Sequence, residues 1–124
     1  MTPANNSTLL AVQKGDDAEF QWNYNLNPGE VVLNFQLFDN VTTLLWDDRT
    51  HTVTKEGKQL FGERLSVDKS SNFLKAVLRN VSWNDTGVTL KLTGGVFDQG
   101  LNLVGRVSSI ISLEVQGKTI HSIK

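Results

Sequence analysis

The side chains that most often carry catalysis or bind metals are scarce in this chain. It contains two histidines, His51 and His121, and no cysteine, which excludes a disulfide, thiolate metal ligands and a thiol nucleophile. The densest donor group is Asp47-Asp48 with His51, which can in principle bind a metal ion but is more often a set of solvated charges on a turn. No nucleophile-elbow, zinc-protease, phosphate-loop or calcium-loop motif is present. The sequence therefore predicts no enzyme, no metal site and no cofactor.

A modification signal is much denser. The acceptor pattern for N-linked glycans, Asn-x-Ser/Thr, begins at Asn5, Asn6, Asn40, Asn80 and Asn84, and the first two overlap. Chance explains some of these matches, because the chain is rich in Asn, Ser and Thr. We expect secretion, with Asn6, Asn40, Asn80 and Asn84 as the candidate glycosylation sites.

Length and composition indicate one globular domain. The chain has 124 residues, 39% of them hydrophobic and 20% charged, with a net charge of −1. These values exclude disorder, and the balanced charge argues against nucleic acid as a partner. No apolar run is long enough to insert into a membrane. We expect a domain over residues 1–116, a tail or linker over residues 117–124, and a location in the ectodomain of a single-pass cell-surface protein.

Period-two alternation of apolar residues predicts an all-β fold. Ala18, Phe20 and Trp22 share one face of an early strand. In the next strand, residues 31–38, the same alternation puts Val31, Leu33, Phe35 and Leu37 on one face and Val32, Asn34, Gln36 and Phe38 on the other.

The second half of the chain continues this pattern. In residues 43–58 a short apolar run is followed by polar residues, which predicts one or two short edge strands with a tight turn. Further strands are expected over residues 64–67, 74–81 and 88–92. Gly94-Gly95 is expected to begin an irregular stretch towards Gly105, before a last strand with Ile111, Leu113 and Val115 inward. Turn signals about every ten residues indicate a Greek-key sandwich of two antiparallel sheets.

One segment resembles a known family. Arg64, a Ser-rich turn, Leu78-Arg79-Asn80-Val81 and Asn84-Asp85-Thr86-Gly87 are similar to the D–E–F region of an immunoglobulin variable-type (V-set) domain. The resemblance implies an ion pair between Arg64 and Asp85 across one end of the sandwich.

The usual tyrosine and cysteine after this segment are missing. Trp22 and Leu90 stand at the two cysteine positions, so the resemblance implies that they pack together in place of a disulfide. Phe35 or Leu33 stands where the family has its core tryptophan.

V-set domains without cysteine are familiar as the outermost domains of carcinoembryonic-antigen-related molecules, of lymphocyte adhesion receptors and of the allorecognition receptors of colonial hydroids. The resemblance therefore implies a recognition or adhesion domain whose partner is the same domain on an opposing cell. Heterophilic receptor binding through the same face is one alternative. A carbohydrate-binding sandwich with Trp46, Trp83 and Phe97 as sugar platforms is another.

In such domains the contact face is the sheet of strands C, C′, F and G. The candidate partner-binding residues are those expected to point outward from it: Asn34, Gln36, Phe38, Trp46, Thr89, Lys91, Phe97 and Leu101, extended by Val96 and Leu103. Phe38 and Trp46 could instead cover the end of the core. Asn40 is expected beside this face, and Asn80 and Asn84 at the opposite end.

Overall fold

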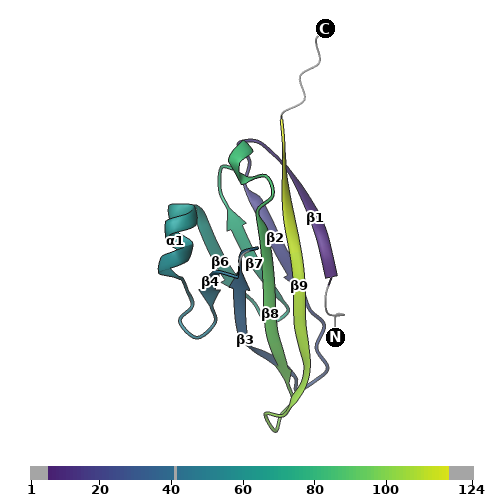
Figure 1. Ribbon diagram of the computed structural model, residues 1–124. Coiled ribbons are helices and arrows are strands. Elements are labelled where there is room, and N and C mark those ends of the chain that lie inside the picture. Colours follow the sequence, from purple (N-terminus) through teal and green to yellow (C-terminus); the bar gives the residue numbers. More distant parts are fainter. Residues whose placement is uncertain (1–5, 41, 118–124) are drawn as a thin grey trace.

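The computed structural model describes residues 6–40 and 42–117, and these form a two-layer β-sandwich (Figure 1). The all-β prediction is confirmed. The strands are β1 (Asn6–Gln13), β2 (Ala18–Asn23), β3 (Val31–Phe38), β4 (Leu44–Asp47), β5 (Thr52–Val53), β6 (Leu65–Lys69), β7 (Phe73–Leu78), β8 (Thr89–Phe97) and β9 (Leu103–Gln116). One short α-helix, α1 (Lys55–Phe61), and two 3₁₀ turns, η1 (Gly62–Arg64) and η2 (Trp83–Asp85), join them.

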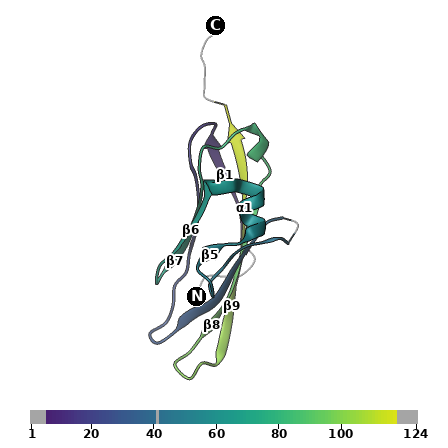
Figure 2. The ribbon, with the colours of Figure 1, turned by 90° about the vertical axis from the view of Figure 1, so that its left-hand side faces the viewer.

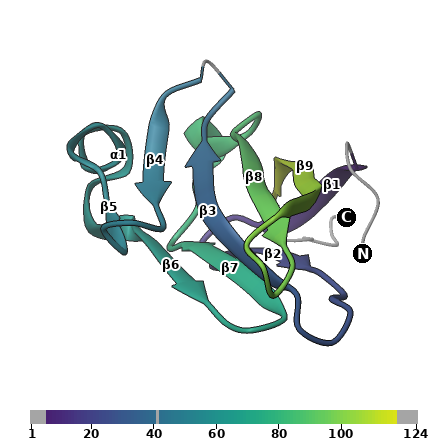
Figure 3. The same cartoon turned by 90° about the horizontal axis from the view of Figure 1, so that it is seen from below.

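The described strands divide into a large and a small sheet. The large sheet has the order β1-β9-β8-β3-β4-β5, and the small sheet has the order β2-β7-β6. Neighbouring strands are antiparallel, except that β1 runs parallel to β9. The large sheet faces the viewer in Figure 1, and the view from below in Figure 3 shows the two layers.

The core lies between the sheets. In β2 buried and exposed residues alternate, with Ala18, Phe20 and Trp22 buried as predicted. Trp22 and Leu90 are both buried in the same hydrophobic cluster, so the two positions expected to replace the disulfide contribute apolar area to one core. A buried large side chain contributes about 1.5–3 kcal/mol. The indole N–H of Trp22 is buried without a hydrogen-bond partner in the described structure.

β3 corrects the predicted faces of the strand over residues 31–38. Val32, Phe35 and Leu37 are buried, whereas Val31 and Leu33 are exposed. The pairing with β8 shifts between Leu33 and Gln36, because the bulge there adds a residue and reverses which side chains point inward. Phe35, and not Leu33, is therefore the core residue of this strand.

α1 replaces part of the expected edge turn. The Thr54 hydroxyl accepts a hydrogen bond from Gly57 N at 3.0 Å, which caps the helix at its N-terminus. A Cβ on Gly57 would lie 2.9 Å from the Leu45 carbonyl oxygen, so this glycine allows the helix to lie close to β4. Figure 2 shows α1 beside the edge of the large sheet.

A long hairpin of β8 and β9 replaces the expected irregular stretch after Gly94-Gly95. Both glycines are strand residues, paired with Val107 and Arg106. A Cβ on Gly94 would lie 2.7 Å from the Phe35 ring, and a Cβ on Gly95 would lie 2.9 Å from the Phe97 ring. Each glycine therefore makes room for an aromatic ring, which is a known use of glycine inside a strand.

Candidate binding face

The outer face of the large sheet is built from the residues that alternate with the core positions. On β8 these are Thr89, Lys91, Thr93, Gly95 and Phe97, because Leu90, Leu92 and Val96 point into the core. Register then places their neighbours on the same face. They are Val31, Leu33, Gln36 and Phe38 on β3, and Leu103, Arg106, Ser108, Ile110 and Ser112 on β9.

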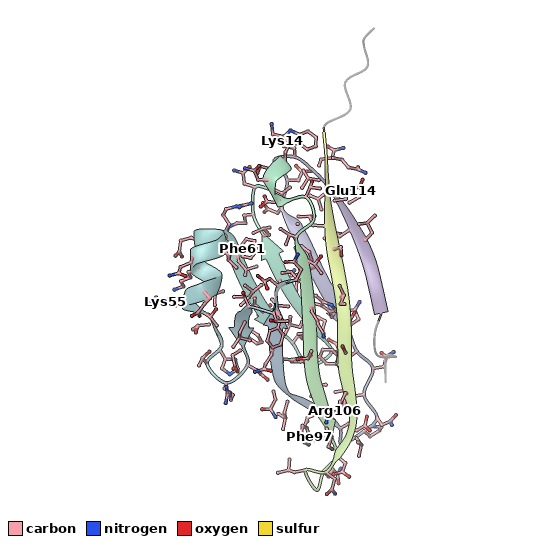
Figure 4. All side chains as sticks on the ribbon, in the orientation of Figure 1. Lys14, Lys55, Phe61, Phe97, Arg106 and Glu114 are labelled. Atoms are coloured by element: carbon pink, nitrogen blue, oxygen red, sulfur yellow. The ribbon has the colours of Figure 1, made fainter. Side chains whose placement is uncertain are left out.

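A hollow of about 410 Å³ lies on this face over Gly95. Four residues predicted for the binding face, Asn34, Gln36, Phe97 and Leu103, line it together with Arg106. The residues lining it also include Thr93, Gly94, Val107 and Ser108. Figure 4 labels Phe97 and Arg106 near the hairpin end of β8 and β9.

Exposed apolar side chains gather at the hairpin end of this face. Val31 pairs with Phe97, which pairs with Leu103, and Leu33 pairs with Gly95. Leu101 at the hairpin tip is 69% exposed. We call these residues, Val31, Leu33, Phe97, Leu101 and Leu103, the hairpin patch. Exposed apolar groups that adjoin one another are typical of an interaction surface.

The structure places most of the other predicted site residues on the same face. Phe38 pairs with Lys91, and Thr89 pairs with Ser112, nearer the far end of the sheet. Trp46 is not on this face: it is 2% exposed and pairs with the inward residue Leu37. Its inclusion among the binding residues was wrong, and the alternative that it covers the core is correct.

Val96 is a second correction, because it is buried in the core. The prediction missed Thr93, Gly95, Arg106 and Ser108, which lie in or directly beside the stretch expected to be irregular. The sequence did contain a signal for Arg106 and Ser108. Ile111 was expected to point inward, and side chains alternate along a strand, so Val107 should also point inward and its neighbours Arg106 and Ser108 outward.

Charged groups at the edge of the face are paired or hydrogen-bonded. Asp47 is buried, and its Oδ2 lies 2.9 Å from Arg49 Nη2. Hydrogen bonds from the Arg49 side chain and backbone lower the pKa of Asp47 below its usual value. At the hairpin tip, Asp98 Oδ1 accepts the backbone N–H groups of Gly100 and Asn102, each at 2.9 Å. The hydrogen bond from the Asn102 backbone is the main cause that lowers the pKa of Asp98.

The structure assembles neither the candidate metal-binding residues nor the candidate sugar-binding aromatic residues into a site. Asp48 Oδ2 lies 2.8 Å from Lys69 Nζ, and His51 Nδ1 lies 3.7 Å from Asp48 Oδ1. Within residues 6–40 and 42–117 no group of three His, Asp or Glu side chains is placed to bind a metal. Of the three sugar-platform candidates, Trp46 is buried, Phe97 lies near the hairpin and Trp83 lies in η2.

Asn40, Asn80 and Asn84, the candidate glycosylation sites whose side chains the structure describes, lie away from the hairpin patch. Asn40 is exposed and follows β3 beyond Phe38, which pairs with Lys91 near the start of β8. Asn80 and Asn84 are exposed and lie on either side of Trp83, before β8 begins. Asn6 begins β1, but its side chain lies outside the described part, as do Asn5 and residues 118–124 of the expected tail.

Comparison with known proteins places the fold. No family model and no curated protein matches the sequence. Solved structures of immunoglobulin domains do match. The murine CRIg structure has a TM-score of 0.70 at 13% identity, covering 87% of this chain and 92% of that one. The ZIG-8 IG1 homodimer has a TM-score of 0.61 at 13% identity, covering 94% and 85%.

The second immunoglobulin domain of the mouse polymeric immunoglobulin receptor is similar as well. Its TM-score is 0.60 at 11% identity, over 92% of this chain and 100% of that one. At this level of identity the likeness concerns the fold alone. No described helix of this chain is long and apolar enough to cross a membrane.

Proposed function

From the premise that this chain is a domain of immunoglobulin fold, we propose that it is an extracellular recognition domain that self-associates through the outer face of its large sheet. β4 and β5 extend this sheet beyond β3, as the C′ and C″ strands do in variable-type domains. Proteins with this architecture are commonly binding modules, and related folds among the solved structures include the ZIG-8 IG1 homodimer.

The observation that carries the proposal is the hairpin patch. Val31, Leu33 and Leu103 are large apolar side chains exposed on adjoining strands, and Leu101 is exposed in the loop that joins β8 to β9. Stable protein interfaces have an apolar core inside a polar rim, and here Gln36, Thr93 and Ser108 supply polar neighbours. The patch adjoins a hollow, so a second surface can place a side chain over Gly95.

The candidate glycosylation sites are compatible with this surface. Asn84 lies in η2, Asn80 lies between β7 and η2, and Asn40 lies beyond the end of β3. Glycans at these positions leave the hairpin patch open, because none of the three asparagines belongs to it.

Sedimentation velocity over a wide concentration range tests the proposal. We expect the wild-type domain to form dimers, and we expect Leu33→Asp together with Leu103→Asp to abolish them, because two carboxylates then have to be desolvated in each half of the contact. Leu60→Asp is the matched control: Leu60 is 54% exposed and lies on α1, outside the face. It should leave dimerisation unchanged.

A wild-type domain that stays monomeric at all concentrations contradicts self-association. The same face would then be tested for a different protein partner by comparing the binding of the wild type and the double variant to cells. Binding that survives the double variant contradicts the assignment of this face.

A further inference from the structure

The cations of the outer face are unpaired. Arg106 and Lys91 are both exposed, and within the described residues neither forms an ion pair. Arg106 lies beside Gly95 at the hollow, and Lys91 lies four residues along β8 from Gly95. The middle of the face therefore carries two positive charges.

A negative charge lies at the hairpin tip. Asp98 accepts hydrogen bonds from two backbone N–H groups of its own loop, and among the described residues it has no cationic partner. These hydrogen bonds lower the pKa of Asp98 and so favour its ionised form. Along one hairpin the sign thus changes from positive at Arg106 to negative at Asp98.

This pattern restricts how two copies can meet face to face. In a two-fold dimer both copies use the same surface, so if one residue of the first copy contacts a second residue on the other copy, the reverse contact also forms. If the two-fold axis lies in the contact plane and runs across the strands, the β8–β9 hairpins meet in opposite directions. A dimer centred on Thr93 then places Lys91 over Gly95 and its neighbour Arg106 on the second copy, so like charges meet in a desolvated contact.

Moving the same axis towards the tip removes this repulsion. A dimer centred on Phe97 stacks the hairpin patches on one another and brings Arg106 opposite the hairpin tip of the second copy. Opposite charges then face each other twice, once on each side of the axis.

We infer that two copies associate hairpin to hairpin, centred on Phe97 and Leu103, with Arg106 of each copy paired with Asp98 of the other. The inference rests on the proposed self-association and adds to it the register of the two copies and the charge pair that selects this register. Arg106 and Asp98 are positioning residues, and the hairpin patch supplies the apolar contact.

A set of charge variants tests this arrangement by sedimentation velocity. Arg106→Glu places two carboxylates together across the contact and should raise the dimer dissociation constant about a hundredfold. Asp98→Asn keeps the acceptor oxygen of the loop but removes the charge, and should raise the constant about fivefold.

The double variant gives the decisive reading. Adding Asp98→Asn to Arg106→Glu removes the new repulsion, so it should lower the dissociation constant relative to Arg106→Glu alone. Asp98→Asn thus weakens dimerisation of the wild type and strengthens dimerisation of Arg106→Glu, as expected for two charges that meet across the contact. Lys91→Glu is the control, with the same change of charge on the same face but away from the pair, and should change the constant by less than about threefold.

The failures of the two proposals are distinguishable. A wild-type chain that stays monomeric removes the self-association itself. A wild-type chain that dimerises, but in which Arg106→Glu has no effect or Asp98→Asn weakens both backgrounds equally, overturns the charge pair and leaves the proposed function standing. Circular dichroism of every variant confirms that the fold is intact.

Discussion

Arg64 and Asp85 join segments of the small sheet to the turn that precedes β8. Arg64 Nη2 lies 2.5 Å from Asp85 Oδ2, as the resemblance implied, and Arg64 Nε donates to the Arg79 carbonyl at 2.9 Å. Asp85 Oδ2 also accepts the backbone N–H of Ser82 at 2.8 Å. The Asp85 side chain is 9% exposed, so its oxygens contact these partners more than water.

Replacing Asp85 should therefore destabilise the domain. We expect Asp85→Ala to lower the free energy of unfolding by about 2–4 kcal/mol, because it leaves Arg64 half-buried without its anion and an N–H group without its acceptor. Urea titration followed by tryptophan fluorescence measures this change. Glu19→Ala is the control, since the Glu19–Lys75 pair is 4.0 Å apart and the Glu19 side chain is 62% exposed. A loss no larger than that of the control, about 0.5 kcal/mol or less, contradicts the assigned role.

At the scale of elements, the bulge in β3 decides which side chains reach the outer face. Asn34 has a φ of 62°, in the left-handed region that asparagine and glycine adopt more readily than other residues. The irregularity follows Leu33, so Val31 and Leu33 point outward while Phe35 and Leu37 point inward. One backbone conformation thus separates the apolar residues of β3 into a patch and a core.

The stability of the bulge should depend on whether the residue at position 34 adopts a positive φ readily, and not only on its size. We expect Asn34→Val to lower the free energy of unfolding by about 1–2 kcal/mol, because a β-branched residue is strained at positive φ. Asn34→Gly should be neutral within about 0.5 kcal/mol, since glycine adopts this conformation readily. Urea titration compares both with Ser108→Val, at an ordinary strand position on the same face. Equal losses for Asn34→Gly and Asn34→Val would contradict the conformational explanation.

At the scale of the whole molecule, the domain has two unlike ends. The hairpin of β8 and β9 carries the hairpin patch, whereas η2 and the end of β9 lie at the other end (Figure 1). The exposed Asn84 belongs to η2, and the exposed Asn80 shortly precedes it. Asn40 lies between the two ends along the sheet, beyond Phe38. A contact centred on Phe97 places Asn40 beyond the hairpin tip of the second copy, while a contact centred on Thr93 places it against the second copy.

Glycosylation at Asn40 therefore separates the two registers. In protein made by secreting cells, with occupancy of Asn40 established by intact mass, we expect Asn40→Gln to change the dimer dissociation constant by less than about twofold. Sedimentation velocity of the two preparations measures the constant. A marked strengthening on removal of the glycan indicates that the centre of the face, and not the hairpin, makes the contact. Asn80→Gln, at the far end, controls for the loss of one glycan.

The sequence by itself determined the fold class and the faces of β2, because alternation with period two and turn residues are local information. The partners of the Arg64–Asp85 ion pair came from the resemblance of their segment to a variable-type domain, and the structure contains the pair. The resemblance to a variable-type domain implied that Trp22 and Leu90 stand in place of the cysteine pair, and both are in the core.

Only the tertiary structure decided how the outer face is completed in β3, in β4 and at the β8–β9 hairpin. An inserted bulge residue reverses the parity of a strand, so the alternation of residues 31–38 could not show that Leu33 is outward and Val32 inward. Trp46 is buried because β4 pairs it with the inward residue Leu37. This pairing is a long-range contact that the residues next to Trp46 in the sequence do not predict. Gly94 and Gly95 carry no side chain to alternate, and they remain in a strand because Phe35 and Phe97 fill the space above and below them.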